Sequence, residues 1–80
     1  MAIPEGWVEN DGALEREFGF RDFGGALAFV NRIGELAEQA DHHPDIAIHW
    51  NTVALRWWTH SQNAITERDR EMAARTNELF

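Results

Sequence analysis

The spacing of apolar residues changes twice along this chain, and Pro44 marks the second change. From Phe23 to Ala40, apolar residues recur at three- and four-residue steps, as they do along one face of an amphipathic helix. Asp22, just before them, is a residue type that caps helix N-termini. The helix must end near Ala40, because proline is disfavoured inside a helix and forces extended geometry on the residue before it. The sequence therefore predicts one helix over residues 22–40, with a different structure on either side.

Alternating apolar and polar residues predict strands on both sides of this helix. The stretches that alternate are residues 13–20, 46–50 and 53–59, and a shorter strand is expected over residues 7–9. Asn10-Asp11-Gly12 and Asn51-Thr52 are turn signals, so two antiparallel hairpins are expected. Thr66 and Asp69 form a variant of the capping box that starts a second helix. The order strand, strand, helix, strand, strand, helix predicts an α+β domain, with a four-stranded antiparallel sheet and the helices packed on one face.

The composition narrows the classes of protein to which the chain can belong. Eighty residues suffice for one small domain, so residues 1–80 are expected to form a single unit. The formal net charge of −7 argues against nucleic-acid binding, which normally needs a basic surface. No apolar run approaches the roughly 20 residues of a membrane span and no signal pattern opens the chain, so no membrane contact and a cytoplasmic location are expected. The chain has no cysteine, which excludes disulfides, thiolate metal ligands and a cysteine nucleophile.

Histidines are expected to gather at one end of the predicted sheet. His42 and His43 lie on the turn between the first helix and the third strand. A hairpin over residues 46–59 returns the end of its second strand to the start of its first, which brings Thr59 and His60 beside that turn. Three imidazoles would therefore converge on loops held by rigid elements, where catalytic groups are often found.

Carboxylates and a fourth histidine lie near this group. Glu38 precedes His42 by four residues, so the two side chains can meet on one face of the helix, and Asp41 adjoins the pair. His49 lies within the hairpin and is expected to stay outside the group. No metal is expected, because neighbouring histidines usually point apart and the chain has neither a His pair at i, i+4 nor an HExxH motif. The other interpretation is that the adjacent histidines are ordinary surface or helix-end residues.

Two adjacent tryptophans are expected to have different surroundings. Trp57 shares a strand face with Val53 and Leu55, which predicts a place in the core. Trp58 shares the opposite face with Arg56, which predicts a place in an interface. A chain this short buries a modest core, and a sheet covered on one face leaves apolar surface open. A homodimer is therefore expected, with a tetramer as the less favoured extension.

Four spaced elements resemble the signature of the pterin-4a-carbinolamine dehydratase family. They are AEQADHHPDI at residues 37–46, His49-Trp50-Asn51-Thr52-Val53, Thr59-His60 and Thr66-Glu67-Arg68-Asp69. The family pattern places an acidic residue four positions before His-His-Pro, then an aromatic residue, a histidine and an aspartate at set distances. The matching residues are Glu38, Trp50, His60 and Asp69. The stretch from Gly6 to Val30 is also similar, so the resemblance covers nearly the whole chain and implies the same four-stranded fold.

The resemblance implies dehydration of a 4a-hydroxytetrahydropterin to the quinonoid dihydropterin, in tetrahydrobiopterin recycling, without metal or organic cofactor. The departing 4a-hydroxyl needs a proton and a ring N–H must lose one, and imidazole groups can do either near neutral pH. Carried over by position, His42 and His60 would be the acid/base pair, and His43 would mainly bind the pterin. The remaining residues implied to bind or support the pterin are Glu38, Asp41, Pro44, Trp58, Thr59, Ser61 and Asp69.

The chain departs from the family pattern in three places. The helix that usually precedes Gly6-Trp7 is expected to be missing, the loop over residues 62–65 is not glycine-rich, and Ile46 stands where tryptophan is common. The loop change is expected to reshape the pocket, whereas none of the three removes a histidine. The alternative function is a non-catalytic interaction module, since animal relatives also act as a dimerisation cofactor for a homeodomain transcription factor. Retention of all three histidines argues for catalysis.

Overall fold

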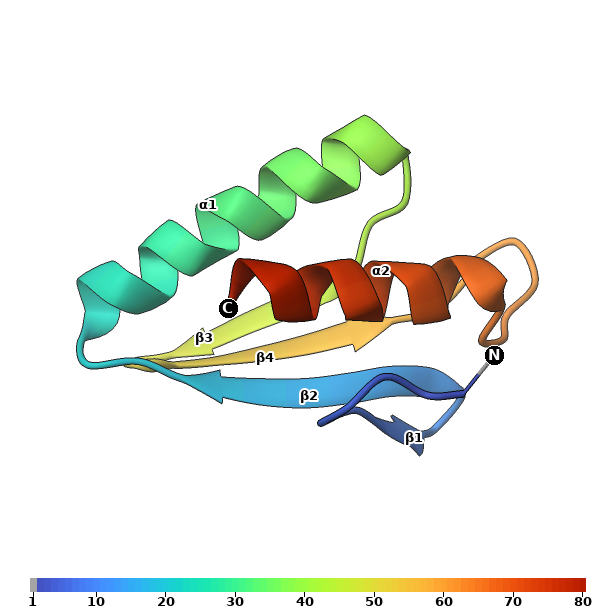
Figure 1. Cartoon of the computed structure of the whole chain (residues 1–80), viewed down its shortest axis with the longest axis horizontal. Helices are drawn as coiled ribbons and strands as arrows, with labels where there is room; N and C mark the ends of the chain where they lie inside the picture. The colour runs from blue at the N-terminus through green and yellow to red at the C-terminus, as the bar shows by residue number, and fades with distance from the viewer. Residues whose placement is uncertain (1) are drawn as a thin grey trace.

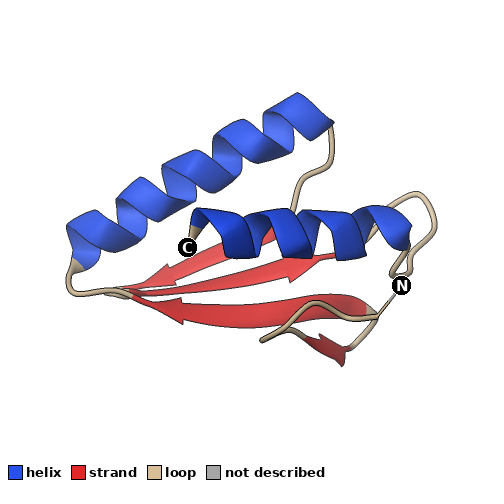
Figure 2. Cartoon of the chain, viewed as in Figure 1, coloured by secondary structure: helices blue, strands red, loops and turns tan. Residues whose placement is uncertain are grey.

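The computed structural model describes residues 2–80, which form a four-stranded antiparallel sheet with two helices. In chain order the elements are β1 (Val8–Asn10), β2 (Ala13–Gly19), α1 (Phe23–Ala40), β3 (Asp45–His49), β4 (Thr52–Trp57) and α2 (Glu67–Leu79). The strands lie in the order β1-β2-β4-β3. Both helices lie over the same face of the sheet, and the other face has no helix over it (Figure 1 and Figure 2). The predicted α+β fold is therefore confirmed in element order and in the placement of the helices.

The first hairpin follows its turn signal. Its two turn residues, Asp11 and Gly12, have φ values of 50° and 76°, the left-handed values that a tight two-residue turn with primed geometry requires. Asn10 pairs with Ala13 across the turn, which fixes the register of β1 against β2. The expected short strand is present, one residue later than predicted.

The second hairpin turns one residue earlier than predicted. His49 pairs with Thr52, so the turn consists of Trp50 and Asn51. Trp50 takes a φ of 54° and is 72% exposed, so it does not share the strand face with the isoleucines of β3. Asn51 is held by Phe20: its side-chain Nδ2 donates to the Phe20 carbonyl at 3.0 Å, and its own carbonyl accepts from the Phe20 N–H at 2.8 Å. This tertiary contact sets the position of the turn.

The core lies between the sheet and the two helices. Asp22 caps α1 by accepting a hydrogen bond from the Gly25 N–H at 2.8 Å, and Asp41, with a φ of 52°, reverses the chain before Pro44. The buried apolar side chains that pack together in this core are Trp7, Leu14, Phe18, Ala26, Phe29, Ile33, Leu36, Ala37, Val53, Leu55, Trp57, Met72 and Ala73. The predicted burial of Trp57 is thus confirmed.

Within the described part of the chain, neither helix is both long and apolar enough to cross a membrane.

The segment before β1 is fixed to α2 through one asparagine. The Asn77 side-chain oxygen accepts hydrogen bonds from the Trp7 indole N–H at 2.8 Å and from the Arg16 guanidinium at 2.5 Å. Its amide nitrogen donates to the Glu5 carbonyl at 2.9 Å. The Arg16 guanidinium also lies 4.4 Å from the centre of the Phe18 ring, within range of a cation–π contact. These contacts close the core on this side of α2.

Candidate active site

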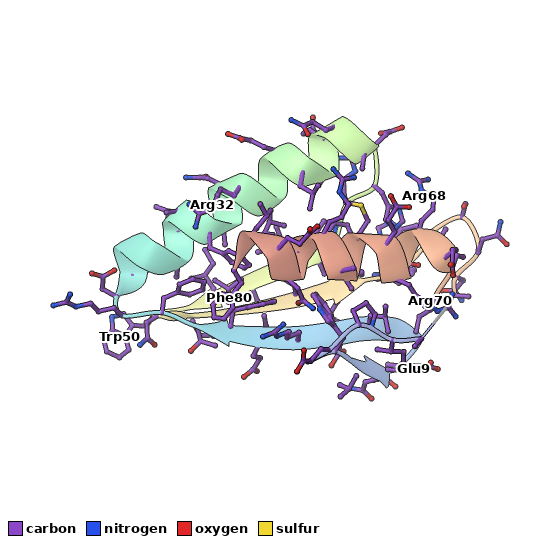
Figure 3. All side chains as sticks on the ribbon, viewed as in Figure 1. Glu9, Arg32, Trp50, Arg68, Arg70 and Phe80 are labelled. Carbon is purple, nitrogen blue, oxygen red and sulfur yellow. The ribbon has the colours of Figure 1, made fainter. Side chains whose placement is uncertain are left out.

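A hollow of about 220 Å³ lies at the end of the sheet where α1 terminates and α2 begins. Its lining residues are Asp41, His42, His43, Thr59, His60, Ser61 and Arg68. They come from the turn after α1, the loop after β4 and the first turn of α2. Arg68 extends beneath the end of α1 at this end of the molecule, whereas Trp50 lies at the opposite end (Figure 3). The expected convergence of three histidines is therefore present.

The end of α1 delivers two of the imidazoles. The backbone N–H groups of Asp41 and His42 donate to the Glu38 and Ala37 carbonyls, at 3.3 and 3.1 Å, and so close the last turn of the helix. The left-handed backbone of Asp41 then turns the chain out of the helix axis. His42 and His43 consequently project from a rigid corner between a helix and a strand.

The loop after β4 delivers the third imidazole. Thr59 and Ala64 form an isolated β-bridge, with the Thr59 N–H donating to the Ala64 carbonyl at 2.9 Å. The residues between them form a closed loop that begins with His60. Asn63 takes a φ of 50° in this loop, a conformation that asparagine tolerates better than most residues other than glycine. The loop can therefore turn without the glycines that the family pattern has there.

His42 is the most confined of the three imidazoles. It is only 7% exposed, its Nε2 lies 2.6 Å from Asp69 Oδ1, and its ring stacks on Trp57 with the ring centres 5.7 Å apart. The expected contact between Glu38 and His42 is not formed, because the partner of His42 is Asp69. A carboxylate only accepts hydrogen bonds, so Nε2–H is the donor, and in the neutral form of the ring Nδ1 is then the nitrogen without a proton.

Asp69 is fully buried and connects three elements. Besides the His42 contact, its Oδ2 accepts hydrogen bonds from the Thr59 hydroxyl at 2.7 Å and from the Thr66 N–H at 2.8 Å. The Thr66 contact belongs to a capping box at the start of α2, as predicted from the sequence. One carboxylate thus caps α2, holds the end of β4 and orients His42.

His43 is held differently from His42. Its Nε2 lies 2.5 Å from Glu38 Oε2, and the two side chains are 52% and 78% exposed. A contact this open to solvent contributes at most about 1 kcal/mol, even when the imidazole is charged. The predicted proximity of Glu38 to the histidines is thus found, but Glu38 contacts the second histidine of the pair and is not among the residues that line the hollow.

His60 is exposed, and its ring lies against Trp58 with the ring centres 4.0 Å apart. The Trp58 indole N–H donates to Asp45 Oδ2 at 2.8 Å. Trp58 lines a different hollow, together with Arg56, and neither Trp58 nor Pro44 lines the histidine hollow. Their expected role in binding the pterin stays a prediction, whereas Thr59, Ser61 and Asp41 line the hollow.

Arg68 is a site residue that the sequence reasoning did not single out. Its guanidinium Nη2 donates to the carbonyls of Ala40 and Asp41, at 2.8 and 3.2 Å, and so ties α2 to the corner that carries His42. Carbonyl groups at a helix C-terminus lack partners within the helix, and an arginine satisfies two of them here. The sequence signal for Arg68 was its position directly before Asp69, a residue of the first turn of α2 that was already expected at the site.

The hollow is lined by groups that can transfer protons and by side chains of both charges. Three imidazoles, the Asp41 carboxylate and the Arg68 guanidinium surround it. Within residues 2–80, no group of three His, Asp or Glu side chains is arranged to hold a metal ion. His49, at the far end of β3, is outside the lining, as expected. The arrangement can place a polar heterocycle against donors and acceptors on several sides.

Replacing Glu38 by glutamine should raise KM for a ligand of this hollow about two- to fivefold and leave kcat nearly unchanged. The Glu38–His43 contact is solvent-exposed, so losing it weakens the interaction that orients His43 by less than about 1 kcal/mol. Steady-state kinetics of Glu38→Gln should be compared with those of Glu35→Gln, which removes the same charge from an exposed position one turn earlier on α1. Equal kinetics for the two variants would show that Glu38 is only a solvated helix residue.

Comparison with known proteins gives one consistent family. Residues 1–79 match the family described as Pterin 4 alpha carbinolamine dehydratase. A relative from Chlorobium limicola, provisionally named a pterin-4-alpha-carbinolamine dehydratase, is 53% identical over 66 residues, which are 82% of this chain and 58% of that protein. A Thermomicrobium roseum protein with the same provisional name is 50% identical over 74 residues, covering 92% of this chain and 80% of its own.

Two solved structures show the same fold. A crystal structure from Brucella melitensis, described as a transcriptional coactivator/pterin dehydratase, superposes with a TM-score of 0.86 at 38% identity, over 94% of this chain and 82% of its own. A pterin dehydratase-like protein described as a RuBisCO assembly factor in the alpha-carboxysome gives 0.74 at 23% identity, over 91% and 84% of the two chains, and supports the fold alone. The family match and the relatives agree, and the chain belongs to the pterin-4-alpha-carbinolamine dehydratase family.

Proposed function

We propose that this protein dehydrates a 4a-hydroxytetrahydropterin to the quinonoid dihydropterin and water, as a step in the recycling of tetrahydrobiopterin. The observation that carries the proposal is the convergence of His42, His43 and His60 on one hollow. The family match supports the same chemistry. Two of the three imidazoles are held by carboxylates, which is the arrangement expected of groups that must keep a fixed orientation for proton transfer.

In the proposed mechanism, protons move at two places on the pterin. The C4a–O bond breaks as the hydroxyl receives a proton and leaves as water, and a ring N–H loses a proton as the new C=N bond forms. His42 accepts the ring proton through Nδ1, because its Nε2 is occupied by Asp69. His60 donates to the departing hydroxyl, and His43 binds the pterin ring.

The direct test is turnover of a chemically generated 4a-hydroxytetrahydropterin by the purified protein. We expect the quinonoid product to appear faster than in buffer, at a rate proportional to enzyme concentration and unchanged by excess chelator. Loss of activity in chelator would favour a metal-dependent reaction instead. A rate equal to that in buffer at all enzyme concentrations would contradict the proposed function and favour an interaction module on this fold.

We also propose that the protein forms a homodimer. The sheet ends in two free edges, β1 and the longer β3, and exposed apolar residues lie on the β3 side, namely Ile46 on the strand and Trp50 in the turn after it. Trp58, the anchor expected from the sequence, is already engaged by His60 and Asp45 within the chain. Free edges that expose apolar side chains are normally covered, and a two-fold dimer is the commonest solution.

Light scattering at micromolar concentration should therefore give about twice the 9.2 kDa mass of the chain. Trp50→Asn should shift the population toward the monomer, because it removes an exposed aromatic and asparagine accepts the positive φ of this turn position. The matched control is Trp58→Phe, which changes a tryptophan just after the end of β4. A stable, active species of 9.2 kDa at the same concentration would rule out the dimer as the working form.

A further inference from the structure

The three imidazoles of the site differ in what holds them. His42 is bonded to a buried carboxylate and His43 to an exposed one. Among residues 2–80, no side chain forms a hydrogen bond with the ring of His60, whose closest defined contact is the face of Trp58 at 4.0 Å between ring centres. The two rings are inclined by 36°. An exposed imidazole at the start of a loop therefore depends on one aromatic contact for its orientation.

Trp58 is itself fixed by a contact to the other strand of the hairpin. Its indole N–H donates to Asp45 Oδ2 at 2.8 Å, and Asp45 is the first residue of β3. Asp45 pairs with Arg56 in the sheet, and Trp58 follows two residues later, just past the end of β4, where its indole reaches Asp45. The Arg56 guanidinium also approaches Asp45 Oδ2 at 3.8 Å. Asp45 is thus fixed by its pairing in the sheet and by the Arg56 guanidinium, and it accepts the hydrogen bond from the indole.

We propose that Trp58 is a positioning residue for His60, and that Asp45 fixes Trp58 in the required place. This inference rests on the proposed function, in which His60 donates the proton to the leaving hydroxyl. The contact suits a group that changes its charge during turnover, because a neutral imidazole stacks on an indole and an imidazolium is attracted to the same π face. Because Asp45 immediately follows His42-His43-Pro44, it also ties His60 to the corner that carries the other two imidazoles.

A double-mutant cycle tests this positioning. Trp58→Leu should lower kcat about tenfold with KM changed less than twofold, since misplacement of a catalytic group by a fraction of an ångström costs rate rather than binding. Asp45→Ala should lower kcat in the same direction, and Asp45→Asn should restore most of it, because the amide oxygen can still accept the indole N–H. In a His60→Ala background, neither Trp58→Leu nor Asp45→Ala should cause a further loss. Phe23→Leu, which replaces an exposed aromatic residue at the start of α1, is the matched control and should leave kcat unchanged.

A second measurement does not depend on activity. Relaxation of the ¹³C-labelled His60 ring should show a rigid side chain in the wild type and in Asp45→Asn, and nanosecond motion in Trp58→Leu and Asp45→Ala. This readout still tests the positioning if His60→Ala retains wild-type turnover, a result that would instead overturn the role of His60 in the proposed function. Positioning by Trp58 is overturned if the His60 ring is equally ordered in all four proteins, if Trp58→Leu lowers kcat equally with and without His60, or if its main effect is a rise in KM. The last result would mean that Trp58 contacts the pterin itself.

Discussion

Replacing His60 by alanine should lower the rate of dehydration about 10²–10³-fold and leave the free energy of unfolding nearly unchanged. The rate loss is the usual contribution of a positioned proton donor. Stability should be unaffected because His60 is exposed and, within residues 2–80, its ring forms no side-chain hydrogen bond and stacks at a tilt on Trp58. Steady-state kinetics and urea unfolding of the variant measure the two quantities separately.

Replacing His42 by alanine should lower the rate by a similar factor but should also destabilise the fold by about 1–3 kcal/mol. The buried Asp69 would lose a hydrogen-bond partner, and an unsatisfied buried polar group costs that much. The double variant should approach the uncatalysed rate. His49→Ala, which removes an exposed histidine at the other end of β3, is the control and should change neither quantity. If both single variants keep wild-type turnover at saturating pterin, the proposed acid/base pair is wrong.

The overall fold could be predicted because its determinants are local in the sequence. The apolar stripe of α1 depends on residues a few positions apart, and so does the alternation of apolar and polar residues in β2 and β4. The proline that follows α1 also acts locally. The Asp11-Gly12 turn also depends only on local backbone preference. The second turn could not be predicted in register, because a distant contact between Asn51 and Phe20 determines which residues form it.

The residues that line the site could be predicted better than the hydrogen bonds that each of them forms. Hairpin geometry alone brings His60 back to the corner that carries His42. The left-handed backbone of Asp41 determines the direction of each imidazole ring, and therefore which carboxylate each ring contacts. The i, i+4 rule for neighbouring side chains applies within a helix and does not hold past Asp41. Glu38 therefore pairs with His43, whereas His42 turns inward to a carboxylate 27 positions away.

Asp69 should be the most sensitive position in the protein. Asp69→Ala removes the acceptor of the Thr66 N–H, the Thr59 hydroxyl and the His42 ring at one buried point. Loss of a helix cap together with buried hydrogen bonds to a charged group should lower the free energy of unfolding by about 2–4 kcal/mol. For a domain of this size that loss lowers the melting temperature by more than about 10 °C. Activity should fall as well, since His42 then has no carboxylate to orient it.

Asp69→Asn separates the two roles. Asparagine keeps the size of the side chain, and its amide oxygen can still accept from Thr66, which places the NH₂ group toward His42. The amide would then donate to His42 Nε2 and reverse the tautomer, so that Nδ1 carries a proton and cannot accept one from the pterin. We expect a folded protein whose kcat is lowered about 10²-fold or more.

The tautomer itself can be measured. Nitrogen-15 chemical shifts of the His42 ring should show a protonated Nε2 in the wild type and a protonated Nδ1 in Asp69→Asn. The control is Glu71→Gln, which removes one negative charge from an exposed position of α2 and should alter neither the shifts nor kcat. A folded Asp69→Asn protein that keeps wild-type kcat would show that Asp69 serves α2 and β4 only. The same result would remove the main support for Nδ1 of His42 as the proton acceptor, because that assignment depends on the hydrogen bond from Nε2 to the carboxylate.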